Sequence, residues 1–300
     1  MSRTDRQGFP VRPVLSLLLA VMCAAALVLL ARFSVGTATG QRLDQLTLSG
    51  AQLASGPLAK IVGLSTGAVS LPVVLGALAC VAVIAVLRRR SDLLVPLAVL
   101  VGGANLTTQV LKHLVVTREV LGPGIDITPN SFPSGHTTLA ASTAIALVLV
   151  SGRARGPVAV LGVLWTAGAG VGTLTLGWHR ASDVAGAIVV VAAWTFLLLA
   201  VDGMVQRRRT TAAHRRTGRS GAETALALVL AATGAIALML GVVSFTGLDL
   251  PLVLHEPSYQ IPAYRTSGAV IGGGTALWMA LVLLLRAPEP SRATTGDRVP

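Results

Sequence analysis

Eight apolar blocks, each near the thickness of a bilayer, constrain this chain of 300 residues more than any other feature. About 20 apolar residues let a helix cross the roughly 30 Å of hydrocarbon in a membrane. In lipid, a helix also satisfies its own backbone hydrogen bonds. The blocks therefore predict an all-α fold, a polytopic membrane bundle of about eight transmembrane helices, with spans near Val14–Ala31, Ala68–Leu87, Leu93–Leu111, Gly135–Val150, Val158–Leu176, Asp183–Val205, Ala222–Phe245 and Ser267–Leu285.

Composition excludes the pair of soluble domains that the length alone would suggest. Hydrophobic residues make up 53% of the chain and charged residues only 12%, whereas a soluble domain carries about 25% charged residues. The fourth and fifth blocks are short, which favours positions surrounded by other protein. The first block is longer than the core of a signal peptide, so we expect it to be retained as a helix.

The net charge of +12 comes from arginines in short loops between apolar blocks. That distribution is typical of residues that set membrane topology and does not indicate a nucleic-acid partner. Seventeen of the lysines and arginines fall in one set of alternate loops and seven in the other. The positive-inside rule then predicts that both termini are cytoplasmic. Arginine far outnumbers lysine, which suggests a GC-rich bacterial genome and hence an integral protein of a bacterial plasma membrane.

Two of the predicted outward loops are long. The first, Ser34–Thr66, holds an amphipathic stretch that we expect to lie along the interface or to cap a site. The second, Asp249–Thr266, carries Pro, Tyr and His and is a candidate lid, although both segments could equally be plain connectors. We expect four parts: two N-terminal helices with an extracytoplasmic loop (1–92), a catalytic core (93–205), a basic cytoplasmic loop (206–221) and a C-terminal two-helix hairpin with its tail (222–300).

Three polar patches fall at helix ends on the predicted outer side. They are Lys112–Arg118 after the third block, Asn130–Thr138 before the fourth, and Gly177–Asp183 between the fifth and sixth. Isolated surface charges would not be expected to collect in this way. Together, the patches predict a site at one face of the bundle.

The second patch has the features of a helix N-terminus that binds an anion. Ser134 is a good N-cap, and Gly135 allows close approach to the backbone. Free N–H groups and the positive end of the helix dipole bind phosphate oxygens. His136 lies in the same turn, where it could exchange a proton with a bound ester. Ordinary capping beside an incidental histidine would give the same pattern.

The other two patches supply a nucleophile and cations. His179 and Asp183 are four residues apart, so on a helix the carboxylate can orient the imidazole as a nucleophile or base. Arg180 adds a cation beside them. Lys112 either extends to the interface or binds phosphate, and Arg118 suits bidentate phosphate contact.

These residues provide what phosphoryl transfer needs without a metal. The reaction requires cations and backbone donors around the phosphate oxygens, an in-line nucleophile and an acid for the leaving group. The chain has no P-loop and no acidic cluster that would hold two metals. Cys23 and Cys80 lie inside apolar blocks and indicate neither a disulfide framework nor a metal site. We therefore expect no metal and no organic cofactor.

At these positions the chain resembles the type 2 phosphatidic acid phosphatase/haloperoxidase superfamily. Pro133-Ser134-Gly135-His136 matches the family's second motif in full, and His179 with Asp183 matches the end of its third motif. The resemblance covers about Leu93 to Leu199. It implies that His179 attacks phosphorus with Asp183 behind it and that His136 protonates the leaving oxygen. It also implies that the phosphate is held by Lys112, Arg118, Ser134 and the Gly135 N–H group.

The chain departs from the family pattern at two arginine positions. No proline follows Arg118, which lies one residue short of the usual interval. The Ser-Arg pair of the third motif falls on Gly172 and Thr173, so that arginine is missing. Our hypothesis is that Arg180 supplies its charge.

The predicted activity is hydrolysis of membrane lipid phosphates or diphosphates at the extracytoplasmic face. A polyprenyl diphosphate such as undecaprenyl diphosphate, a phosphatidate-like lipid and phosphatidylglycerol phosphate all remain open as substrates. One alternative is a lipid phosphotransferase. Another is a non-catalytic phospholipid-binding or transport protein with a relic site. The sequence does not indicate an oligomeric state.

Overall fold

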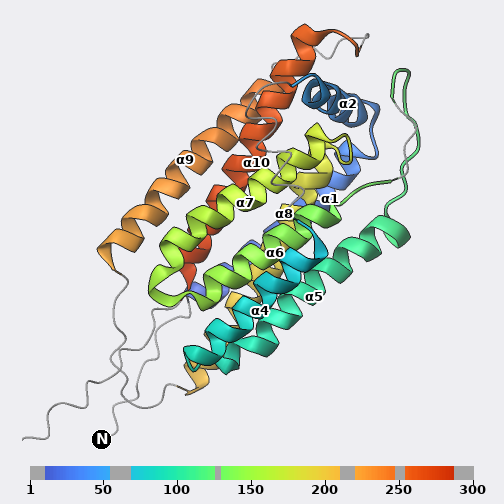
Figure 1. Cartoon of the computed structure of the whole chain (residues 1–300). Coiled ribbons are helices and arrows are strands. Elements are labelled where there is room, and N and C mark those ends of the chain that lie inside the picture. Colours follow the sequence, from blue (N-terminus) through green and yellow to red (C-terminus); the bar gives the residue numbers. More distant parts are fainter. Residues whose placement is uncertain (1–10, 55–68, 126–129, 210–219, 247–253, 287–300) are drawn as a thin grey trace, which may run out of the picture.

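The computed structural model describes residues 11–54, 69–125, 130–209, 220–246 and 254–286. Within these ranges the regular structure is helical, and no strand occurs. The predicted all-α fold is therefore confirmed (Figure 1). The main helices are α1 (Val11–Ser34), α2 (Ala38–Leu53), α4 (Leu71–Leu87), α5 (Leu94–Val110), α6 (Gly135–Val150), α7 (Arg155–Thr175), α8 (Ala181–Arg209), α9 (Gly221–Thr246) and α10 (Pro257–Leu285).

Among the described residues, six helical segments are long and apolar enough to cross a membrane, and two shorter apolar helices accompany them. The long ones are Val11–Ser34, Ser91–Val115, Gly152–Thr175, Ala181–Val205, Gly221–Thr246 and Pro257–Leu285, and the shorter ones are Pro72–Leu87 and Gly135–Val150. These eight segments correspond to the eight predicted blocks. How many of them cross the bilayer, and in which direction, stays a prediction.

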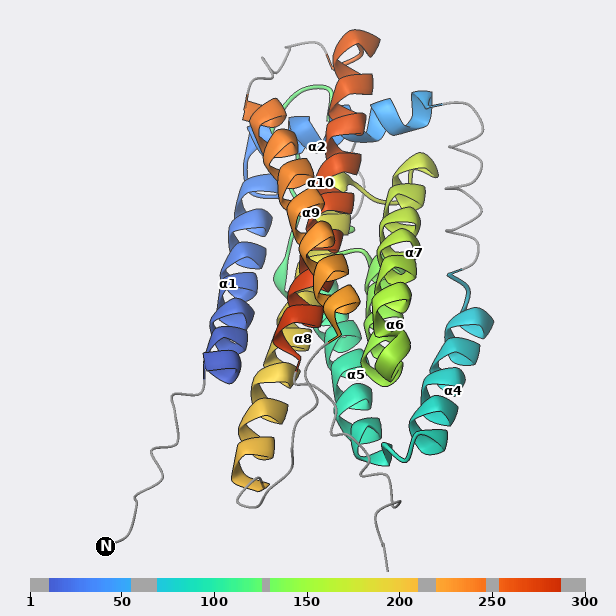
Figure 2. The same ribbon diagram turned by 90° about the vertical axis from the view of Figure 1, so that its left-hand side faces the viewer.

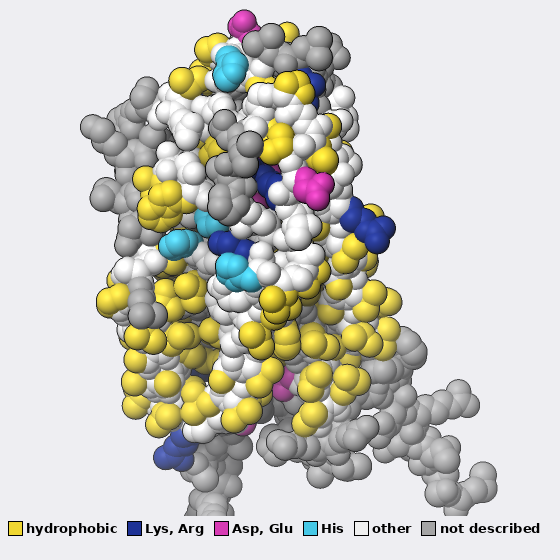
Figure 3. Space-filling view, turned by 90° about the vertical axis from the view of Figure 1, so that its right-hand side faces the viewer, with side chains coloured by type: hydrophobic (Ala, Val, Ile, Leu, Met, Phe, Trp, Pro, Cys, Tyr) yellow, Lys and Arg dark blue, Asp and Glu magenta, His cyan; other side chains and the backbone are white. Residues whose placement is uncertain are grey.

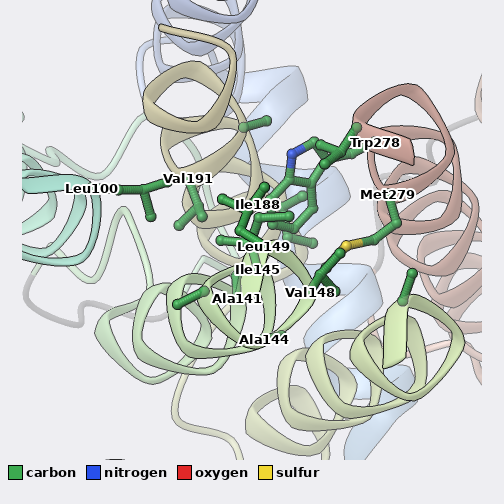
Figure 4. Close-up of a cluster of buried hydrophobic side chains, with 14 of the residues drawn as sticks. Leu100, Ala141, Ala144, Ile145, Val148, Leu149, Ile188, Val191, Trp278 and Met279 are labelled. Carbon is green, nitrogen blue, oxygen red and sulfur yellow. The ribbon is translucent and has the colours of Figure 1, made fainter. Parts of the chain in front are cut away.

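The helix α6 lies at the centre of the bundle. It contacts α4, α5, α7 and α8, and twelve of its sixteen residues are buried. Its small residues, such as Ala141 and Ala144, allow neighbouring helices to approach closely, as is usual where helices pack in membranes. This short helix is surrounded by protein, as its length predicted. Figure 4 shows Ile145, Val148 and Leu149 of α6 packed with side chains of α5, α8 and α10.

Outside this centre, α1 packs mainly on α8, and α9 packs mainly on α10. The first residues of α1 and α9 and the last residues of α4 and α8 lie toward one end of the bundle. The helix α2 lies across the opposite end (Figures 1 and 2). There α2 contacts α1, α7, α8 and α10. The described part of the amphipathic stretch in the first long loop is therefore a helix that covers one end of the bundle, and residues 55–68 lie outside the described residues.

The second long loop is shorter than predicted. Most of Asp249–Thr266 belongs to α10, which begins at Pro257 rather than near Ser267. The polar residues at the start of this helix interrupt the apolar pattern. One of them, Gln260, is buried against α2, where a Cβ atom added at Gly50 would lie 2.0 Å from its carbonyl oxygen. Residues 247–253 lie outside the described residues.

The helices α9 and α10 pack on each other, and of these two only α9 is mostly exposed. Trp278 and Met279 of α10 are buried in the main core (Figure 4). The basic cytoplasmic loop that we expected before α9 lies mostly outside the described residues.

The topology predicts opposite accessibility for two exposed serines. Ser91 lies between α4 and α5 on the predicted cytoplasmic side, and Ser258 lies at the start of α10 on the outer side. In a chain with Cys23 and Cys80 replaced by alanine, an impermeant maleimide added to intact cells should label Ser258→Cys. It should label Ser91→Cys only after the membrane is opened. The reverse labelling pattern would contradict the assigned orientation.

Candidate active site

The first patch begins in a helical segment that directly continues α5. A short π-helix, Leu111–Val115, continues α5 and carries Lys112, after which Val116 is extended. Such π-type turns occur frequently at functional sites. The side-chain amide of Asn130 donates to the carbonyl oxygens of Lys112 (3.0 Å) and Val116 (2.7 Å). These bonds fasten the first patch to the second.

The second patch is anchored to α8. Phe132 is fully buried and lies against Gly186, where an added Cβ atom would be 2.6 Å from the phenyl ring. The N–H of Ser134 donates to the carbonyl of Asp183 over 2.9 Å. The Ser134 hydroxyl accepts from the N–H of Thr137 at 3.3 Å, so Ser134 is the N-cap of α6, as the sequence predicted.

The N-terminus of α6 is open to a ligand. The first N–H groups of a helix have no carbonyl partner within the helix, and those of Gly135 and His136 find no acceptor among the described residues. A Cβ atom added at Gly135 would have only the Gln109 amide nitrogen within 4 Å, at 3.7 Å. Backbone donors and the helix dipole are therefore available to an anion here.

The third patch is a turn closed by Gly177, whose φ of +72° is a conformation that favours glycine. The N–H groups of Trp178 and His179 both donate to the carbonyl of Thr173, at 2.9 and 3.2 Å. His179 is 6% exposed, and Asp183 has no exposed surface. The turn therefore presents His179 just before α8 begins.

Asp183 stands behind His179 but is not hydrogen-bonded to it. The imidazole Nδ1 lies 3.5 Å from Asp183 Oδ2, and neither Nδ1 nor Oδ1 has a hydrogen-bond partner among the described residues. Asp183 Oδ2 accepts from the Ser131 hydroxyl (2.5 Å) and from the Arg180 N–H (2.8 Å). The i, i+4 pair that the sequence predicted is therefore present as a 3.5 Å contact between the imidazole and the carboxylate.

Two imidazoles from different patches face one another. The ring centroids of His136 and His179 are 6.1 Å apart, with planes inclined by 62°. Trp178, which lies in the same turn as His179, packs on His136 with ring centroids 5.3 Å apart. Lys112 is half-buried and near enough for its charge to act on His136. The structure thus brings together His136, His179 and Lys112.

Arg118 makes a buried ion pair that the sequence did not reveal. Its Nη2 lies 3.2 Å from Oδ2 of Asp44 on α2, and both side chains are about 95% buried, at 4% and 5% exposure. Asp44 also accepts from the backbone N–H of Ser182 (3.1 Å) and from its hydroxyl (2.5 Å). Nothing in the sequence indicated that Asp44 pairs with Arg118 and Ser182. The sequence indicated only that the stretch containing Asp44 could cap a site.

The environment of Asp44 makes its carboxyl group easier to protonate than in water. Burial and the nearby charge of Asp183 raise the pKa of Asp44 to about 6, against the opposing effects of Arg118 and Ser182. The two carboxylates are therefore close enough to repel each other. Both lie at the N-terminus of α8, where the helix dipole favours negative charge.

Arg180 reaches back toward the second patch. It is 3% exposed, and its Nη1 donates to the Ser131 hydroxyl over 3.2 Å. Thr173 is fully buried within α7, and its hydroxyl donates to the Gly170 carbonyl over 2.7 Å. Arg180 is therefore a cation beside the Ser131–Asp183 pair, one residue from His179.

The described residues contain no group of three or more His, Cys, Asp or Glu side chains that could hold a metal ion. Figure 3 shows histidine and basic side chains gathered at the edge of a broad band of hydrophobic side chains. A site at such an edge can reach a polar head group while the hydrocarbon of the same molecule remains in lipid.

Residues 71–209 match the PAP2 superfamily. This segment is a PAP2 superfamily domain. The resemblance based on the PSGH motif and on His179 with Asp183 is therefore confirmed. The PAP2 domain starts with α4, before the core that we predicted to begin at residue 93, and it leaves out α1, α2, α9 and α10.

A solved structure similar to this chain is described as the first transmembrane PAP2 type phosphatidylglycerolphosphate phosphatase, from Bacillus subtilis. The two share 22% identity over 64% of this chain and 97% of that chain, with a TM-score of 0.48. No curated protein matches the sequence.

Proposed function

We propose that this protein is a phosphatase of membrane lipid phosphates or diphosphates that works without a metal, through a phosphohistidine on His179. The observation that carries the proposal is that the ring centroids of His136 and His179 lie 6.1 Å apart, beside the open N-terminus of α6. The PAP2 domain supports phosphatase activity. The lipid, the chemical steps and the membrane face are part of the proposal.

In the first step, a ring nitrogen of His179 attacks phosphorus, and the bond from phosphorus to the leaving oxygen breaks. His136 gives a proton to that oxygen. Asp183 stabilises the positive charge that develops on His179, and the present 3.5 Å separation shortens as the charge grows. Distances of this kind are often longer before substrate binds.

In the second step, water attacks the phosphohistidine and the bond from nitrogen to phosphorus breaks. His136, now neutral, takes a proton from the water, and inorganic phosphate leaves. The same imidazole thus acts first as acid and then as base, which restores the enzyme. General acid–base catalysis of this kind contributes about 10²–10⁴-fold.

The phosphate is held by Lys112, Arg118 and the N–H of Gly135. Lysine and arginine neutralise the charge on the equatorial oxygens, and the backbone donor is fixed before the substrate arrives. Ser134 supports this arrangement as the cap of α6, because its hydroxyl already accepts from Thr137. Arg180 acts from the side of Ser131 in our hypothesis, in place of the arginine that is missing at Thr173.

Histidine and basic side chains gather at the edge of the hydrophobic band (Figure 3), which favours a substrate with a phosphate head and an apolar tail. A polyprenyl diphosphate such as undecaprenyl diphosphate, a phosphatidate-like lipid and phosphatidylglycerol phosphate all meet this description. The loop distribution of arginine favours the extracytoplasmic face of a bacterial plasma membrane.

Replacing each histidine in turn should distinguish the proposed nucleophile, His179, from the proposed general acid, His136. We expect His179→Ala to lower kcat by about 10⁴-fold or more, because the covalent route is lost. His136→Ala should lower kcat by about 10²–10⁴-fold. Phosphate release from a panel of lipid phosphates and diphosphates, measured in detergent with EDTA present, checks both values. The control is His255→Ala, an exposed histidine in the turn just before α10.

Full turnover by His179→Ala would contradict the phosphohistidine route. If the wild type binds lipid phosphates without cleaving any of them, the protein is the non-catalytic binder that the missing third-motif arginine would suit. Loss of wild-type activity in EDTA would contradict the absence of a metal.

The replacement of Arg180 tests the compensating charge. Arg180→Ala should lower kcat/KM by about 10²-fold, the usual cost of losing one donor that stabilises a transition state. The control is Arg265→Ala, because Arg265 is exposed on α10. Near-normal kcat/KM on a substrate that the wild type cleaves would show that Arg180 does not fill this role.

A further inference from the structure

The helix α2 lies outside the PAP2 domain yet supplies a carboxylate to the site. Asp44 joins Arg118 of the first patch to Ser182 of α8 through contacts of 3.2, 3.1 and 2.5 Å. A buried carboxylate is costly unless it is paired and hydrogen-bonded. Here the pairing connects a phosphate-binding candidate to the helix that follows His179.

A second residue of α2 holds the backbone just beyond Arg118. The amide nitrogen of Gln41 donates to the carbonyl oxygens of Val35 (2.8 Å) and Glu119 (2.6 Å). Its amide oxygen accepts from the N–H of Leu121 at 3.1 Å. Gln41 and Asp44 are three residues apart and so share one face of α2. One helix face therefore fixes both the Arg118 side chain and the chain that follows it.

Arg118 keeps donors available after pairing with Asp44. Its Nε and Nη1 are buried and have no partner among the described residues. Buried donors of a charged group are normally satisfied, so these nitrogens favour a further acceptor. The open N-terminus of α6 receives an anion in the proposed function, and phosphate oxygens are suitable acceptors for a guanidinium.

We propose that Asp44 is a positioning residue of the phosphate site, which holds the Arg118 guanidinium so that its remaining donors meet the substrate phosphate. The inference rests on the proposed function, because it concerns the same site. Asp44 acts through Arg118 and does not contact the reacting atoms. The helix α2 is thereby an integral part of the active site.

This role predicts an effect on substrate binding that depends on Arg118. Asp44→Ala should raise KM about tenfold, since a hydrogen bond to a charged group is worth about a factor of ten or more. It should change kcat by less than about threefold. In an Arg118→Ala background the same replacement should change neither constant further, because the residue it positions is already gone.

The experiment is a double-mutant cycle with Asp44→Ala and Arg118→Ala, scored by kcat and KM on a substrate that the wild type cleaves. The control is Thr47→Val: Thr47 is fully buried on α2, and its hydroxyl donates only to the carbonyl of Asp44 within the helix, at 2.8 Å. We expect wild-type constants for this control. An unchanged KM in Asp44→Ala, or the same tenfold loss in both backgrounds, would overturn the proposal.

A binding measurement separates this inference from the proposed function. Calorimetric titration of inorganic phosphate into wild type, Asp44→Ala and Asp44→Asn requires no turnover. Asp44→Asn keeps the size of the side chain and one acceptor, so it should weaken phosphate binding less than alanine does and serves if the alanine variant fails to fold. If no lipid phosphate is cleaved, the phosphatase proposal fails while this titration still decides the role of Asp44. The positioning role of Asp44 would be overturned by equal phosphate affinity in wild type and Asp44→Asn, or by no phosphate binding in wild type.

Discussion

A carboxylate without exposed surface has to find its hydrogen bonds inside the protein, and Asp183 finds them on separate segments. Its Oδ2 accepts from the Ser131 hydroxyl and the Arg180 N–H, and its main-chain carbonyl accepts from the N–H of Ser134. These bonds hold the loop before α6 against the start of α8. These bonds also set the distance between the His136 and His179 imidazoles, because His136 lies at the start of α6 and His179 just before α8.

Two helix N-termini meet at this end of the bundle, and the protein uses them differently. At α8, the side chains of Asp44 and Asp183 already accept from the N–H groups of Ser182 and Arg180. At α6, the first N–H groups have no acceptor among the described residues. An incoming anion is therefore favoured at α6, next to His136, and disfavoured at α8, where two carboxylates would repel it.

Much of this arrangement could be predicted from the sequence because it depends on short local patterns. The apolar blocks gave the helices, Ser134 gave the start of α6, and the spacing of His179 and Asp183 gave their common face. The roles of these residues in catalysis remain proposals. The early start of α10 was missed because its first turns carry exposed polar residues such as Ser258 and Arg265, and the continuous apolar pattern begins only after them.

The contributions of Asp44, Gln41 and Ser131 could not be predicted because they depend on contacts between distant parts of the chain. Asp44 meets Arg118 across 74 residues and Ser182 across 138. Ser131 lies in the second polar patch and Gln41 and Asp44 lie in the first long loop, but no periodicity marks the distant partner of any of them. Only the fold shows that α2 brings such residues over the site.

The most direct test of the account is a structure determined with orthovanadate, which resembles the phosphoryl group during transfer. We expect vanadium bonded to a ring nitrogen of His179, with vanadate oxygens in hydrogen-bonding contact with the Arg118 guanidinium and the Gly135 N–H. We expect His136 on the side of the vanadate opposite His179. Vanadate bound away from His179, or His136 and His179 separated so that no single anion reaches both, would contradict it.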